Sequence, residues 1–336
     1  MQFNLIEGFY GHHWLPKQRL ALIPFLARLG FSGYCYAPKS DFTLRKHLRL
    51  AFDEIQLAHF NELAELARQH QICFSVALSP IYDHQLPLGN ALKNKIKQLQ
   101  QLDINIVLLL DDMKVEADHF AREQARFVNE VRQYIDQQQL FFCPTFYSSD
   151  PCLEKFFGTR PDNYWQTLGA ELDTKIDVFW TGEKVVSSTY TRSNIEMIAE
   201  LIQRNPVIWD NSAVTDGKSS SDFLPLSRRV DFSSISSIVS SVWFNPMNAF
   251  ALMKLQLGFQ MQSQSTNFSD YLSAHYAKLA QSLLRNLSLF EVDGLSKLSS
   301  AQKKQLLSVF SGQTDEEDAI RDWLNGKFIF DPACLT

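Results

Sequence analysis

Short apolar runs alternate along the chain with longer segments in which apolar residues recur three and four positions apart. The short runs are rich in β-branched and aromatic residues, as expected of strands. They lie near residues 3–6, 32–36, 72–78, 104–110, 140–146, 176–180, 206–209 and 238–244. The longer segments have the apolar spacing of amphipathic helices. They lie near residues 16–29, 54–70, 91–102, 115–138, 161–172 and 191–204.

This alternation predicts parallel strands joined by right-handed helical crossovers. Eight such units in roughly 260 residues match the usual size of a (β/α)8 TIM barrel. A doubly wound open sheet is the alternative. No G-x-G-x-x-G sequence follows the first strand and no Walker loop is present, so a dinucleotide or nucleoside-triphosphate fold has no support.

After about residue 262 the strand patterns stop, and helical patterns follow at residues 268–290, 297–311 and 315–325. We therefore predict an α/β chain with a (β/α)8 barrel over residues 1–262 and a small all-helical C-terminal region over residues 263–336. The helices of that region offer a surface through which the chain could form oligomers.

Composition and charge exclude several classes of protein. The net charge of the 336-residue chain is -5 and no long basic run is present, so nothing indicates a nucleic-acid partner. No apolar stretch approaches the ~20 residues of a membrane span. The N-terminus enters a strand at once and lacks the pattern of a signal peptide, so a cytoplasmic location is expected. The five cysteines form no C-x-x-C pair, which favours free thiols over disulfides or zinc.

Two adjacent aspartates, Asp111 and Asp112, follow the apolar run at residues 104–110. A buried parallel strand that ends on two carboxylates places them at the mouth of a sheet, where α/β enzymes keep their active sites. Two carboxyl groups so close resist ionising together, so their pKa values should differ and provide one acid and one base. The alternative is that Asp112 caps the next helix, and on this segment alone that interpretation is favoured.

The other predicted strands also end in polar residues, aromatic residues, or glycine and proline, which have special backbone conformations. At the C-terminal face of a barrel, such residues are expected to bind or catalyse. Aromatic rings stack on the C–H faces of sugars, while carboxylates and amides bond hydroxyls. The strand ends therefore suit a neutral, polyhydroxylated ligand. They comprise Glu7-Gly8-Phe9-Tyr10, Tyr36-Ala37-Pro38-Lys39, Ser79-Pro80, Cys143-Pro144-Thr145, Trp180-Thr181-Gly182, Trp209-Asp210-Asn211 and Asn245-Pro246.

At these residues the chain resembles glycoside hydrolase family 84, the O-GlcNAcases and related β-N-acetylglucosaminidases with a hyaluronidase-like NAGidase domain. The resemblance covers about residues 3–250, with seven motifs in order, and no motif covers the helical tail. The motifs are Glu7-Gly-Phe-Tyr-Gly with Trp14, Tyr36-Ala-Pro-Lys with Asp41 and Arg45, Asp111-Asp112, Cys143-Pro-Thr-x-Tyr147, Trp180-Thr-Gly-x-Lys-Val-Val186, Trp209-Asp-Asn211 with Asp216, and Asn245-Pro.

The resemblance implies a retaining exo-glycosidase that needs no metal and no cofactor. In this family the 2-acetamido oxygen of the sugar attacks the anomeric carbon and forms an oxazoline, an exception to the scheme with an enzyme nucleophile. By position, Asp111 would orient and polarise the acetamido N–H. Asp112 would act first as general acid and then as general base.

The resemblance also implies a set of substrate-binding residues. Each has an ordinary structural interpretation when taken alone, such as a solvated lysine, a core cysteine or a turn asparagine. Of these, Cys143, Tyr147 and Trp209 would hold the acetyl group. The full set is Gly8, Lys39, Cys143, Tyr147, Trp209, Asn211, Asp216 and Asn245.

The chain departs from the family pattern at His12, His13, Ser40, Ile81 and Phe146. Adjacent histidines could indicate a metal, but a solvated loop pair is favoured because no H-x-H or H-E-x-x-H occurs. We expect the loops that carry His12, His13, Ser40 and Phe146, together with residues 217–222, to form a shallow acceptor side. The expected substrate is a glycoprotein, glycopeptide or small glycoside that carries N-acetylglucosamine. A sugar-binding barrel without turnover, or an unrelated barrel hydrolase, remains the alternative.

Overall fold

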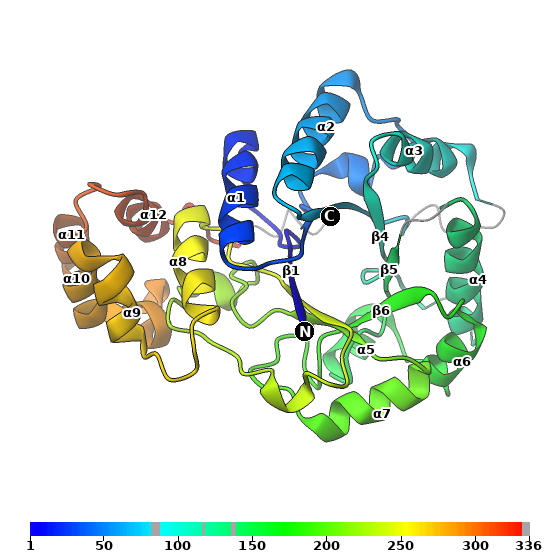
Figure 1. Cartoon of the computed structure of the whole chain (residues 1–336). Coiled ribbons are helices and arrows are strands. Elements are labelled where there is room, and N and C mark those ends of the chain that lie inside the picture. Colours follow the sequence, from blue (N-terminus) through cyan, green and yellow to red (C-terminus); the bar gives the residue numbers. More distant parts are fainter. Residues whose placement is uncertain (82–87, 116–117, 136–138, 331–336) are drawn as a thin grey trace. The chain divides into compact units, whose positions relative to one another are not determined.

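The computed structural model describes residues 1–81, 88–115, 118–135 and 139–330. Its parallel strands close into a barrel in the order of the sequence, and the last strand pairs with the first (Figure 1). The predicted (β/α)8 barrel is therefore confirmed, and the open sheet is wrong. The strands are β1 (Gln2–Ile6), β2 (Gly33–Tyr36), β3 (Cys73–Leu78), β4 (Asn105–Leu109), β5 (Leu140–Cys143), β6 (Ile176–Trp180), β7 (Val207–Asp210) and β8 (Ser241–Phe244).

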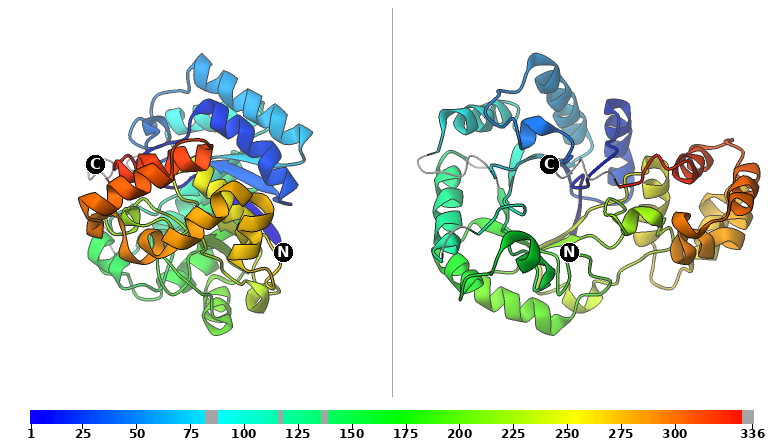
Figure 2. Two further views of the ribbon diagram at one scale, coloured as in Figure 1. Left: turned by 90° about the vertical axis from the view of Figure 1, so that its left-hand side faces the viewer. Right: turned by 180° about the vertical axis from the view of Figure 1, so that it is seen from behind.

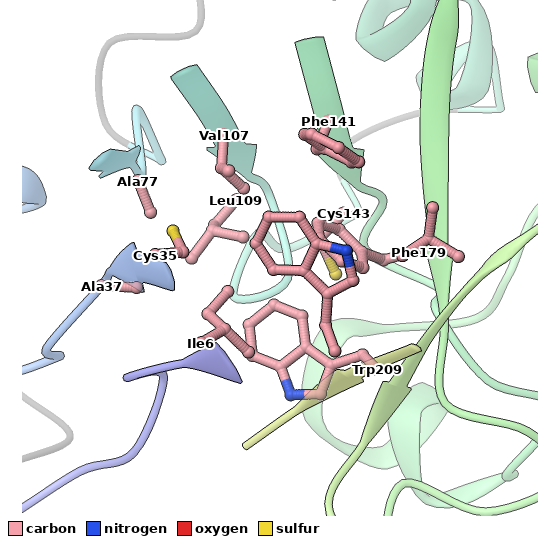
Figure 3. Packing of buried hydrophobic residues seen from close by; sticks show 12 residues of the cluster. Ile6, Cys35, Ala37, Ala77, Val107, Leu109, Phe141, Cys143, Phe179 and Trp209 are labelled. Carbon is pink, nitrogen blue, oxygen red and sulfur yellow. The ribbon is translucent and has the colours of Figure 1, made fainter. Parts of the chain in front are cut away.

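The barrel strands are short and buried. Every residue of β2, β5, β7 and β8 is buried, because both faces of a parallel sheet are covered. The inward side chains form one hydrophobic core, which Figure 3 shows from close by. In the parallel register, Leu109 of β4 lies beside Cys143 of β5. The chain therefore leaves these two strands at neighbouring points of the barrel.

Helices alternate with the strands, as the sequence predicts. Local signals account for their starts: the side chain of Asp53 accepts from Gln56 N at the start of α2, and that of Thr191 accepts from Asn194 N at the start of α7. Part of the helix predicted near 115–138 lies outside the described residues. The helices are α1 (Pro16–Arg28), α2 (Glu54–Gln69), α3 (Asn90–Gln101), α4 (Phe120–Gln133), α5 (Cys152–Phe157), α6 (Tyr164–Glu171) and α7 (Arg192–Ile202).

Further helices follow the last strand. Helix α8 (Phe250–Gln260) packs against α12 (Asp315–Leu324), and both lie in the C-terminal helical group of Figure 2. The helices α9 (Phe268–His275), α10 (Ala277–Ser288) and α11 (Ser300–Val309) match the predicted helical patterns. In the described part of the chain, no helix is both long and apolar enough to cross a membrane.

The chain divides into two compact units. Unit 1 comprises residues 1–7, 19–211 and 232–244 and contains the whole barrel. Unit 2 comprises residues 8–18, 212–231 and 245–336. The domain boundary between residues 262 and 263 that the sequence indicates stays a prediction, which limited proteolysis can test.

The cysteines that the structure describes have free thiols, as expected from their number and spacing. Cys35 and Cys143 are buried, Cys73 is exposed and Cys152 is partly exposed. Cys334 lies outside the described residues.

Candidate active site

The two aspartates at the end of β4 face two basic side chains from the chain that follows β2. Lys39 Nζ lies 2.6 Å from Asp111 Oδ2 and 3.7 Å from Asp112 Oδ2. Arg45 Nη2 lies 2.6 Å from Asp112 Oδ2. Two positive and two negative side chains therefore gather at one point of unit 1, and we call these four residues the charged quartet.

Lys39 is a buried lysine whose charge is compensated. Its side chain is 3% exposed, and burial alone would lower its pKa. The carboxylates of Asp111 and Asp112 outweigh burial, so the pKa of Lys39 is raised above its ordinary value. The ammonium therefore stays charged at neutral pH. A surface lysine, the ordinary interpretation from sequence, does not describe this residue.

Asp111 has one satisfied and one unsatisfied carboxylate oxygen. Burial raises its pKa, the charge of Asp112 adds to this, and the Lys39 ammonium opposes it. Oδ2 accepts from Lys39, whereas the buried Oδ1 has no hydrogen-bond partner among the residues that the structure describes. A buried acceptor without a donor costs about 1–3 kcal/mol. Asp111 therefore presents an acceptor atom that a ligand donor would satisfy.

Asp112 does not cap a helix. The helix that follows it is α4, which begins at Phe120 with His119 in the capping position. The side chain of Asp112 is 25% exposed and instead accepts from Arg45. The helix-cap interpretation is therefore wrong.

Cys143, Trp209 and Tyr147 come together in the barrel, as expected of the acetyl pocket. Cys143 and Trp209 belong to the hydrophobic core, and Tyr147 packs against that core. Figure 3 shows Cys143 and Trp209 among its inward-pointing side chains. Burial raises the pKa of the Cys143 thiol well above its usual range, and the charge of Asp111 raises it further. The thiol is therefore protonated and acts as a small apolar surface near Asp111.

Asn211 follows β7 directly and has a fixed orientation. Its Oδ1 accepts from Trp209 Nε1 at 2.8 Å, and its Nδ2 donates to the Val185 carbonyl at 2.9 Å. The neighbouring Asp210 carboxylate accepts from the Tyr190 hydroxyl. The amide of Asn211 is thus held next to the indole ring by its own hydrogen bonds.

The remaining predicted binding residues belong to unit 2. Gly8 N donates to Asn245 Oδ1 at 3.2 Å, and these residues come shortly after β1 and directly after β8, respectively. Tyr10 N donates to Asp216 Oδ2 at 2.9 Å. Unit 2 therefore pairs Gly8 with Asn245 and fixes Asp216, while unit 1 gathers the rest of the predicted site.

The departures from the family pattern lie in different surroundings. His12 and His13 are exposed, and the His12 ring lies 5.5 Å from that of Phe328. Burial lowers the pKa of His12, and the charges of Lys327 and His13 lower it further. Among the described residues, no group of three or more His, Cys, Asp or Glu side chains could hold a metal.

Ser40 and Ile81 are partly exposed, but Phe146 is not part of a loop surface as expected. Phe146 is buried, with its ring 5.0 Å from that of Tyr164 on α6. Phe146 lies beyond the end of β5, which stops at Cys143 before Pro144, and its side chain packs against α6. The prediction that Phe146 lines the acceptor side is therefore wrong.

Two features of the site were not singled out from the sequence. Arg45 occurs in the family motif but was not assigned to the site. Glu7, which is fully buried, accepts from Arg19 Nε and Nη2 at 2.8 and 2.7 Å and from the Tyr34 hydroxyl at 2.7 Å. This buried ion pair fixes the end of β1. No residue spacing in the sequence signals it.

Comparison with known proteins identifies the family of the chain. Residues 4–286 match the family model described as NAGidase, beta-N-acetylglucosaminidase. The chain is 33% identical over 228 residues to the protein O-GlcNAcases of Rattus norvegicus and of Mus musculus. The match covers 63% of this chain and 24% of each relative, so the chain spans about a quarter of their length.

A solved structure gives the same result over almost the whole chain. It is a mutant of the O-GlcNAc hydrolase of Thermobaculum terrenum, with a TM-score of 0.75 and 25% sequence identity. The alignment covers 96% of this chain and 80% of that chain. Together with the match to residues 4–286, this means that the chain belongs to the beta-N-acetylglucosaminidase family.

Proposed function

We propose that the protein is a retaining exo-β-N-acetylglucosaminidase in which the acetamido group of the substrate is the nucleophile. The observation that carries this proposal is the state of Asp111. One oxygen is held by Lys39 at 2.6 Å, and the other is a buried acceptor without a partner among the described residues. An acetamido N–H is a donor of the kind that this oxygen lacks.

In the first step, Asp112 donates its proton to the glycosidic oxygen as the bond from that oxygen to C1 breaks. The acetamido carbonyl oxygen forms a new bond to C1, and Asp111 accepts a hydrogen bond from the acetamido N–H. Positive charge then develops on the bicyclic oxazoline ring. The ionised Asp111 stabilises this charge, and the Lys39 ammonium favours the ionised form of Asp111.

In the second step, Asp112 is ionised and takes a proton from water. The water oxygen bonds to C1 as the bond between C1 and the oxazoline oxygen breaks, and this regenerates the acetamido group. The sugar leaves with its original anomeric configuration, because C1 is attacked once from each side. Asp112 ends the cycle protonated, ready to act again.

We assign the acetyl methyl to the pocket of Cys143, Tyr147 and Trp209. The buried thiol and the indole ring provide apolar surface, and we assign the hydroxyl of Tyr147, which packs against this core, to the oxazoline. Gly8, Lys39, Asn211, Asp216 and Asn245 are proposed to bind the sugar hydroxyls and the acetamido group. Backbone and amide groups of this kind fix orientation in small-molecule sites.

The names of the relatives indicate the substrate class. Two are called protein O-GlcNAcases and the third an O-GlcNAc hydrolase, so we propose β-O-linked N-acetylglucosamine on Ser or Thr of proteins as the substrate. A small glycoside is the alternative acceptor. The expected cytoplasmic location stays a prediction, as does oligomerisation through α9 to α12.

The test compares three aryl glycosides that share one leaving group. The N-acetylglucosaminide should be hydrolysed, the N-trifluoroacetyl analogue much more slowly, and the plain glucoside not detectably. Equal rates on all three would refute substrate assistance. Tight binding of N-acetylglucosamine without any turnover would instead support the sugar-binding alternative.

A further inference from the structure

The chain between β2 and α2 supplies two cations to the carboxylate pair, and only Lys39 has a role in the mechanism proposed above. Lys39 holds Asp111, while Arg45 Nη2 lies 2.6 Å from Asp112 Oδ2. We propose that Arg45 is a positioning residue that orients the Asp112 carboxylate and favours its ionised form, and thereby sets the upper pH limit of hydrolysis. This inference rests on the function proposed above.

The backbone at Arg45 is fixed from one side by a capped turn. The 3₁₀ turn η1 (Phe42–Leu44) immediately precedes Arg45, whose N–H donates to the Phe42 carbonyl at 3.1 Å. The Asp41 carboxylate caps this turn by accepting from Thr43 N and Oγ1 and from the Tyr36 hydroxyl. The start of the arginine side chain therefore has little freedom.

A second contact ties the same turn to the barrel. Ser79 N, at the end of β3, donates to the Leu44 carbonyl at 2.8 Å, and the Leu44 side chain is buried. Arg45 itself is 7% exposed. A guanidinium held in this way can define the position of the carboxylate that it contacts, because both partners are anchored to neighbouring strand ends.

Arg45 has opposite effects on the two proposed steps. A general acid must carry a proton, whereas a general base must not. A guanidinium in contact with a carboxylate favours the ionised form, so Arg45 assists the base and restrains the acid. Among the described residues, Lys39 at 3.7 Å, the adjacent Asp111 and the Cys143 thiol also act on Asp112. Arg45 lies nearer to the Asp112 carboxylate than Lys39 does.

The test is the pH profile of kcat/KM with an alkyl N-acetylglucosaminide, whose departure requires a proton. In Arg45→Met, the carboxylate loses its contacting guanidinium and keeps its proton to higher pH. We expect the alkaline limb to move upward by about 1–3 pH units, the usual effect of an arginine on a neighbouring aspartate. With a nitrophenyl leaving group, which departs without a proton, the alkaline limb should be absent or weak in both proteins.

Two further variants separate this role from general damage. Arg45→Lys retains the positive charge and should keep the alkaline limb near that of the wild type. Lys46→Met removes a partly exposed positive charge from the same loop, whose ammonium lies 5.0 Å from the centre of the Phe42 ring, and should leave the profile unchanged. Urea denaturation of each variant shows how much folded protein contributes to the measured rates.

The result that overturns the inference is a kcat/KM profile of Arg45→Met that falls uniformly, with its alkaline limb where the wild type has it. Such a result means that Arg45 only supports the loop. A wild-type profile without an alkaline limb on the alkyl substrate overturns it as well. If the wild type fails to hydrolyse any N-acetylglucosaminide, the proposed function itself is wrong, which is a different outcome.

Discussion

Replacement of Lys39 by methionine is the most informative change to the charged quartet. Methionine has a similar length and no charge, so Asp111 loses the ammonium 2.6 Å from its Oδ2. The Lys39 side chain is 3% exposed and that of Asp111 is 13% exposed, so little water replaces the lost charge. The pKa of Asp111, which burial and Asp112 already raise, should rise further.

The size of the effect follows from the distance. Coulomb's law at 2.6 Å gives about 6 kcal/mol with an effective dielectric constant of ~20. Desolvation of the two charges and relaxation of the site offset most of this attraction. Measured effects of a neighbouring cation on an aspartate are about 1–3 pKa units, and this is the change that we expect.

Activity and stability should then respond to pH in opposite directions. Asp111 must be ionised in the proposed mechanism, so the acidic limb of kcat/KM should move upward by about 1–3 pH units and activity should recover as the pH rises. Stability behaves differently, because a carboxyl whose folded pKa is raised stabilises the fold below the unfolded pKa and loses that contribution as the pH rises. The variant should therefore be less destabilised at pH 5 than at pH 8.

The assays are a pH series of kcat/KM on a nitrophenyl N-acetylglucosaminide and urea denaturation at pH 5 and pH 8. At pH 8, loss of one partner from a buried ion pair should lower the free energy of unfolding by about 3–5 kcal/mol. Lys175→Met, at an exposed position, is the control and should change neither profile. A uniform fall in kcat/KM with an unmoved acidic limb would show that Lys39 acts only as a hydroxyl ligand and does not control Asp111.

Three further predictions follow from the site and the barrel. Asp112→Ala should lose about 10²–10⁴-fold in rate on poor leaving groups and less on nitrophenyl glycosides, whose hydrolysis azide should restore. Asp111→Ala should lose activity on both kinds of substrate without azide rescue, and parallel losses in the two variants would contradict the assigned roles. Lengthening the N-acyl group from acetyl to butyryl should slow hydrolysis stepwise, by about 1–3 kcal/mol for each methylene, because the pocket at Cys143 is part of a packed core; ready use of the N-butyryl substrate argues against that pocket. Arg19→Met should destabilise the fold by about 3–5 kcal/mol in urea denaturation because Glu7 is left buried and unpaired, and a loss below about 1 kcal/mol would show that water reaches Glu7.

The strands could be predicted closely because barrel strands are buried on both faces and appear as continuous apolar runs. The run at 104–110 corresponds to β4 in this way. The helix α8 was not predicted, because nine of its eleven residues are buried and its sequence has no polar face to define a helical period. The six-residue α5 is too short to show a period at all.

Part of the site could also be predicted. Residues at the carboxyl ends of neighbouring parallel strands must lie close together, which is why Asp111 and Asp112 could be placed at the mouth of the barrel from the sequence. Cys143 could be assigned to the same site only through the family resemblance, because a cysteine at the end of an apolar run is by itself a core residue. Arg45 could not, because it is a long side chain in an irregular loop and most arginines are solvated. The pairing of Glu7 with Arg19 and Tyr34 depends on how β1, α1 and β2 pack, which no local pattern contains.

One short segment, residues 39–45, supplies both cations of the charged quartet. A local opening of this segment would withdraw Lys39 and Arg45 from the carboxylates in a single event, while the barrel stays folded. Loss of activity on mild heating or in low denaturant should therefore precede global unfolding and be fully reversible. The fraction of inactive molecules should equal the opened fraction that hydrogen exchange at the Arg45 amide reports. Exchange at this one amide would therefore measure how many molecules have an assembled site.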